Sequence, residues 1–278
     1  MVLFVLIITT LVYVFSKAMG FSSLGLAGFA LIIAGFTSIG SYYFSDKLVL
    51  ATTGAKQIRK QDYPEYFRIV ENLCIGAGLP APKIYVINDP SPNAFATGRD
   101  PKHAVVCATT GLLSIMSESE LEGVIAHELS HIKNYDIRLM GVVAVLVGFV
   151  AILSDIFIRM TFYSDDRDSK GNQIFLILAI FFAIISPIAA TLIQLAISRK
   201  REFLADASGV LLTRYPEGLA SALEKLARDH TAPKTASNAT AHLFIENPFD
   251  NKKVKNFFTS LFNTHPPLEE RIKILRSM

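Results

Sequence analysis

The chain has 278 residues, of which 51% are hydrophobic and only 18% charged, and its mean hydropathy is +0.39. An ordinary soluble domain is about 45–50% apolar even with glycine counted, so this composition indicates an integral membrane protein. A formal net charge of +3 without a basic tract argues against a nucleic-acid partner. The two cysteines, Cys74 and Cys107, are too few and too distant for a disulfide framework or a cysteine zinc site.

The first elements predicted are two membrane spans. Residues 2–15 form a continuous apolar run that extends towards Gly20, and residues 24–44 form a second. A cleavable signal peptide is the alternative for the first run. It requires a basic segment before the apolar core, and none is present. We therefore expect a transmembrane hairpin, although the first run is shorter than the roughly 20 residues that a span needs.

The composition of residues 45–138 is that of a soluble domain. Residues 62–76 have helical periodicity, and residues 83–88 are rich in β-formers. Prolines crowd the start of a short strand at residues 93–98, which is typical of an edge strand. A third strand at 103–108 is expected to form a hairpin with it.

Ser117 and Glu120 form a capping-box pattern, which predicts that a helix begins there. No stop signal precedes the apolar run 139–158, so we expect this helix to continue into a third span. A fourth span is expected at 174–197, kinked at Pro187. Further helices are expected at 202–214, 217–229 and within 263–272.

Lysine and arginine are more frequent on the side of the spans that carries residues 45–138 and 198–278. This asymmetry predicts that these segments and both termini are cytoplasmic. The expected organisation is a transmembrane hairpin at 1–44, a catalytic part at 45–138, a second transmembrane hairpin at 139–197 and a helical part at 198–278.

The central motif is His127-Glu128-Leu129-Ser130-His131, which reads H-E-x-x-H within a helical pattern. Residues i and i+4 lie on one face of a helix, so both imidazoles can bind one ion. Glu128 lies beside this pair, where it can act as general base towards the attacking water. Neutral imidazoles suit Zn²⁺, and we expect one zinc ion per chain.

A catalytic zinc needs a third protein ligand, and Glu202 is the candidate. Asp206 follows at i+4 and is expected to accept a hydrogen bond from the other ring nitrogen of one ligand histidine. The alternatives for the third ligand are His265 and, more distantly, His103, His230 and His242. If the helices are continuous with the spans, His131 and Glu202 lie about 12 Å and about 8 Å from the membrane boundary.

Together with four spans, the motifs H-E-L-S-H, R-E-F-L-A-D, N-A-F-A-T-G and T-H-P-P-L-E-E-R resemble the HtpX family of membrane zinc metalloproteases, relatives of the CAAX prenyl proteases. The resemblance covers nearly the whole chain. It implies a zinc endopeptidase of the bacterial inner membrane that acts in protein quality control and the stress response. It supports His127, His131 and Glu202 as ligands and Glu128 as base. It also implies that Asn93, Ala94, Phe95 and Ala96 line the substrate cleft, and that His265 stabilises the oxyanion.

The fold class expected is a mainly α-helical integral membrane protein of α+β type. It has four transmembrane helices and a cytoplasmic zincin-type catalytic domain with a small antiparallel sheet. Its substrates are expected to be unfolded or membrane proteins, cut at the bilayer. Two alternatives remain at this point: a CAAX-type prenyl-protein protease, and a non-catalytic metal-binding membrane adaptor, which would not need Glu128.

Overall fold

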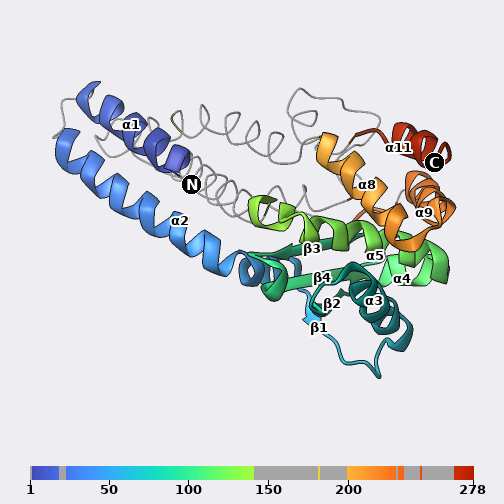
Figure 1. Cartoon of the computed structure of the whole chain (residues 1–278). Helices are drawn as coiled ribbons and strands as arrows, with labels where there is room; N and C mark the ends of the chain where they lie inside the picture. Colours follow the sequence, from blue (N-terminus) through green and yellow to red (C-terminus); the bar gives the residue numbers. More distant parts are fainter. Residues whose placement is uncertain are drawn as a thin grey trace.

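The computed structural model describes residues 2–18, 23–140, 181, 199–229, 231–234, 245 and 266–278. The third and fourth predicted spans and the loop between them fall almost entirely outside the described residues. The same is true of His230, His242 and His265. In the described part, a long helical hairpin extends from one end of a compact α+β region (Figure 1).

The hairpin consists of α1 (Val2–Ala18) and α2 (Ser23–Thr53), which pack against each other (Figure 1). The second helix runs on past Phe44, the expected end of the span. Apolar side chains along α2 point outward, with Leu24 80% and Phe36 74% exposed. In the part of the chain that the structure describes, no single helix is both long and apolar enough to cross a membrane. Gly28–Gly40 and Tyr42–Thr53 meet those criteria together, with a bend of 70° between them.

The sheet has four strands in the order β1-β2-β4-β3. The strands are β1 (Lys56–Gln57), β2 (Lys83–Ile87), β3 (Ala94–Gly98) and β4 (Ala104–Thr109). The predicted hairpin of β3 and β4 is confirmed, and β3 lies at the edge as expected. The expectation of an antiparallel sheet is wrong. After β2 the chain first forms the edge strand β3 and then reverses into β4, which lies between β2 and β3. Strand β4 is therefore antiparallel to β3 and parallel to β2.

The two faces of the sheet pack against different helices. Because side chains alternate along a strand, Ala94 and Ala96 of β3 join the main core with α3 (Pro64–Ala77) and α5 (Glu118–Lys133). Phe95 points to the opposite face, where it meets Val49 of α2. The edge strand is therefore held between the helix of the H-E-x-x-H motif and the hairpin helix.

The remaining helices complete the α+β region. Helix α4 (Thr110–Ile115) follows β4, after a 3-10 turn (Pro101–His103) in the β3–β4 connection. Helices α8 (Arg199–Thr213), α9 (Pro216–Arg228) and α11 (Leu268–Leu275) pack against α5 or against one another (Figure 1). The predicted helices at 62–76, 202–214 and 217–229 are thus present, with ends shifted by a few residues.

The expectation that α5 continues into the third span is wrong. The helix begins as predicted, because the Ser117 N–H donates to the Glu120 carboxylate at 2.7 Å. It ends at Lys133, and Tyr135 then adopts a left-handed backbone with φ of 60°. That conformation costs a residue with a Cβ about 1–2 kcal/mol. Helical backbone resumes at residues 136–140.

Gly123 allows α5 and α9 to touch. A Cβ at this position would lie 2.6 Å from the Leu219 nitrogen, which is closer than such atoms approach. We predict that Gly123→Ala lowers the free energy of unfolding by about 1–3 kcal/mol, as overpacking does. Thermal unfolding followed by circular dichroism checks this. Gly35→Ala is the control, because its Cβ would meet nothing within 4 Å, and an unchanged melting temperature in Gly123→Ala would contradict the packing argument.

Candidate metal centre

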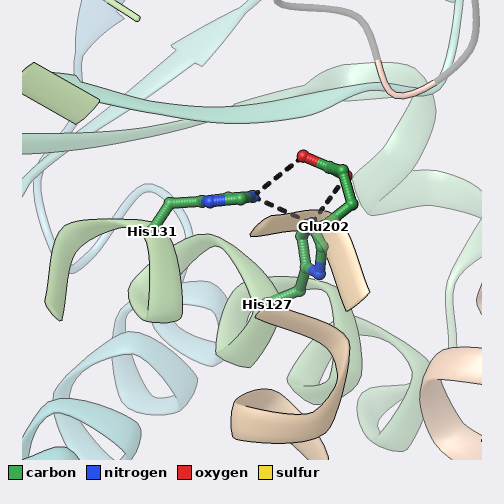
Figure 2. Close-up of side chains that lie close together, drawn as sticks. All are labelled: His127, His131 and Glu202. Atoms are coloured by element: carbon green, nitrogen blue, oxygen red, sulfur yellow. Dashed lines mark hydrogen bonds and ion pairs between the residues drawn. The ribbon is translucent and has the colours of Figure 1, made fainter. Parts of the chain in front are cut away.

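Helix α5 presents two histidines one turn apart in a buried position. His127 and His131 are 4% and 3% exposed, and their Nε2 atoms lie 3.2 Å apart. Both rings therefore direct the same nitrogen towards one point (Figure 2). The helix is buried along most of its length between the sheet and the later helices, so these imidazoles are held by packing.

Helix α8 brings Glu202 to the same point. The carboxylate is fully buried, and its two oxygens lie 3.7 Å from His127 Nε2 and 3.5 Å from His131 Nε2 (Figure 2). Gly209 makes this close approach of α8 to α5 practicable, since a Cβ there would lie 3.1 Å from the His127 nitrogen. One ligand atom from each of the three residues falls within 4.8 Å of the others.

The donor set fits a divalent metal ion. A tetrahedral ion with bonds of about 2.0–2.1 Å keeps its ligand atoms about 3.4 Å apart. The distances between the two Nε2 atoms and from each Nε2 atom to Glu202 are 3.2, 3.5 and 3.7 Å, on both sides of that value. Four carboxylates and two guanidiniums meet around the histidines, so a divalent cation would balance the charge. The six residues are Glu128, Asp136, Glu202, Asp206, Arg201 and Arg271.

Each histidine has a carboxylate on its other ring nitrogen. His127 Nδ1 lies 2.9 Å from Asp206, and His131 Nδ1 lies 3.0 Å from Asp136. Such partners fix which ring nitrogen carries the proton, and leave Nε2 for a metal. The contact of Asp206 agrees with the prediction from its i+4 spacing to Glu202, whereas that of Asp136 was not predicted.

Two arginines close the site and were also missed. Arg271 of α11 is 1% exposed and donates to both Asp206 oxygens at 2.8 and 2.6 Å. Arg201 of α8 forms an ion pair with Asp136. Arg271 stands within the T-H-P-P-L-E-E-R motif, but an arginine in a short helix gives no sequence signal that it is buried.

The charges in the site shift two pKa values. Burial opposes ionisation of Asp206, but the hydrogen bonds and charges of His127 and Arg271 outweigh it and lower the pKa to about 2. Burial likewise disfavours the charged form of His131. The hydrogen bond to Asp136 and the nearby Glu202 and Glu128 carboxylates outweigh it and raise the pKa to about 9. Protons and metal therefore compete for His131.

The other predicted residues occupy varied positions. Glu128 is 5% exposed beside the ligands. Ala94, Phe95 and Ala96 are buried in β3. The Asn93 side chain accepts a hydrogen bond from the Ile245 N–H at 3.0 Å, so a later segment binds the start of this strand.

Of the alternative ligands considered for the site, the structure describes one, His103. His103 lies apart from the site, where it pairs with Asp100 and is half exposed. His265 lies outside the described residues, and its role stays a prediction.

A buried pair of histidines on H-E-x-x-H with a glutamate from a later helix defines a metallopeptidase site. The model of the family "Peptidase family M48" matches residues 60–278. A protein of Dictyoglomus turgidum named "Protease HtpX homolog" is 50% identical to this chain, and the match covers 90% of this chain and 81% of the relative. A protein of the same name from Caldanaerobacter subterraneus subsp. tengcongensis is 45% identical, and that match covers 100% of this chain and 92% of the relative. The chain belongs to peptidase family M48 and, within it, to the HtpX proteases.

A solved structure agrees with the fold. The crystal structure of S. mikatae Ste24p superposes on this chain with a TM-score of 0.52 and 19% sequence identity. The match covers 96% of this chain and 62% of the Ste24p chain. At that identity the likeness concerns the fold alone. The chain is thus a metalloprotease with a Ste24p-like fold and a small mixed sheet.

The His131 pKa predicts opposite pH effects on stability and on metal binding. The pKa is about 6.5 in the unfolded chain and about 9 in the folded one. His131 therefore stabilises the chelator-treated protein fully below pH 6.5, and this contribution is lost as the pH rises through 9. Metal affinity rises over the same interval, because the ligand must lose its proton. Melting curves and chelator competition between pH 6 and 9.5 measure both, and parallel trends would contradict the assignment.

Proposed function

We propose that this metalloprotease is a zinc endopeptidase that cleaves misfolded or damaged membrane proteins at the cytoplasmic face of the bacterial inner membrane, in protein quality control and the stress response. The observation that supports it most is the convergence of His127, His131 and Glu202 beside the buried Glu128. Two imidazoles and one carboxylate are ligands that suit zinc. When bound, zinc supplies Lewis-acid polarisation of the scissile carbonyl.

The residues of the chain perform the proton transfers. Glu128 accepts a proton from the water that attacks the carbonyl carbon, and passes it to the amide nitrogen as the C–N bond breaks. Asp206 holds the His127 ring in orientation through the Nδ1 atom of that histidine. Burial excludes bulk water from this cluster, which strengthens the electrostatic interactions within it.

Substrate binding is proposed at the edge strand β3. An edge strand offers backbone groups to an extended peptide with little dependence on its sequence, which suits a protease for unfolded segments. Phe95 of β3 packs against Val49 near the end of α2. Earlier in the same helix, large apolar side chains such as Phe36 are exposed. Chains that emerge from the bilayer along this helix would meet β3 first.

The test of the function is hydrolysis of unfolded casein by the full chain purified in detergent. Activity should disappear with a chelator and return with stoichiometric Zn²⁺. Survival of activity in the chelator would overturn the proposal.

Glu128→Gln should reduce hydrolysis by at least 100-fold and retain zinc, because the residue transfers protons and is not a ligand. Glu202→Ala should lose zinc as well as activity. Metal analysis and the casein assay on the same preparations separate the two roles. Glu122→Gln, a partly exposed position on the same helix, is the control and should behave as wild type. Zinc loss in Glu128→Gln would make Glu128 a ligand.

The proposed topology has four spans, with the site and both termini in the cytoplasm. Its support is the excess of lysine and arginine beside the spans on one side. A reporter inserted near Ser169 should be external, whereas one fused after Met278 should be cytoplasmic. Labelling of a cysteine at Lys200 by a membrane-impermeant reagent in intact cells would contradict this arrangement.

A further inference from the structure

The most informative feature outside the ligand set is the break in the chain after α5. Asn134 caps the helix, and Tyr135 takes the left-handed conformation, with φ of 60°. A side chain five residues after His131 would point away from it on a continuous helix, since five residues turn by about 500°. The break instead returns Asp136 to His131, with an Oδ2–Nδ1 distance of 3.0 Å.

Asp136 is buried and held from two sides. It is 2% exposed, and its other carboxylate oxygen, Oδ1, forms an ion pair with Arg201. Arg201 immediately precedes Glu202. The Asp136 carboxylate therefore contacts both the His131 ring and α8, the helix that carries Glu202.

We propose that Asp136 is a positioning residue for the metal centre: it accepts the Nδ1 proton of His131 so that Nε2 is left for the metal, and Arg201 fixes the carboxylate in that role. This inference rests on the proposed metal centre. It assigns to the segment after the H-E-x-x-H helix a function equivalent to that of Asp206 for His127. The left-handed Tyr135 is the backbone cost of that arrangement.

The two positioning carboxylates differ in one respect. Arg271, which binds Asp206, is fully buried, whereas the Arg201 side chain is 42% exposed. Salt screens exposed charges much more than buried ones. The Arg201 contribution should therefore decrease at high ionic strength, while that of the buried hydrogen bond between Asp136 and His131 should not.

The test measures the zinc dissociation constant of the full chain in detergent, by competition with a chelator of known affinity. Asp136→Asn and Asp136→Ala should each weaken zinc binding by about 10–100-fold. The asparagine variant should bind zinc more weakly although the shape of the side chain is conserved. Its amide can donate a hydrogen bond to His131 Nδ1, which leaves the ring proton on Nε2, the atom that must bind the metal. The visible spectrum of the cobalt-substituted protein should also change, which mere loss of stability would not produce.

The matched control is Asp100→Asn. Asp100 contacts the Nδ1 atom of His103 at 2.8 Å in the same manner, but away from the metal centre. It should leave zinc affinity and the cobalt spectrum unchanged. Arg201→Gln should weaken binding by several-fold at low salt and by less at 1 M salt. Tyr135→Gly should bind zinc within about twofold of wild type and melt at a higher temperature, because glycine adopts this backbone freely.

The outcomes separate this inference from the proposed function. If wild type binds no zinc that depends on Glu202, the proposed metal centre itself fails. If wild type binds zinc and Asp136→Asn binds it equally well with an unaltered cobalt spectrum, only the role of Asp136 is overturned. Equal weakening by Asp100→Asn would also overturn it. The isosteric Asp136→Asn and the surface variant Arg201→Gln keep the test decisive if Asp136→Ala does not fold.

Discussion

The burial of acidic groups where α5 crosses α8 is the constraint on which the site depends. Glu202, Asp206 and Asp136 are 0–2% exposed, and a buried carboxylate is costly unless it is paired and hydrogen-bonded. The chain meets this cost with arginines from α8 and α11, with imidazole N–H groups, and with a site for a divalent cation. Removing any one of these positive groups would leave a buried negative charge uncompensated.

This constraint also explains the arrangement of the helices. Gly209 lets α8 approach the α5 backbone at His127, which is what brings Glu202 within reach of both histidines. Arg271 then fixes α11 over the crossing through its two hydrogen bonds to Asp206. On the opposite side of β3, Phe95 anchors the sheet to α2. The metal centre, the edge strand and the hairpin are thus successive layers of one packed unit.

Much of this site was predictable because its signals are local. The spacing of His127 and His131, and that of Glu202 and Asp206, places each pair on one helix face whatever the tertiary fold. Asp136 was not predictable, because its role depends on a left-handed backbone at a residue other than glycine. The parallel pairing of β2 with β4 was missed for a related reason: strand neighbours across a crossover leave no periodicity in the sequence. The contact between Asn93 and Ile245 spans 152 residues, beyond any local pattern.

The separation of these parts along the chain has a consequence for biosynthesis. Arg271 contacts His127 across 144 residues, and closing so long a loop has a larger entropic cost than closing a short one. While the ribosome is still adding α8 and α11, the nascent chain carries His127 and His131 without Glu202 and Arg271, which lie beside them in the folded protein. The buried charges of Glu202 and Asp206 are therefore joined to the two histidines and to Arg271 only after the last of these segments has been synthesised.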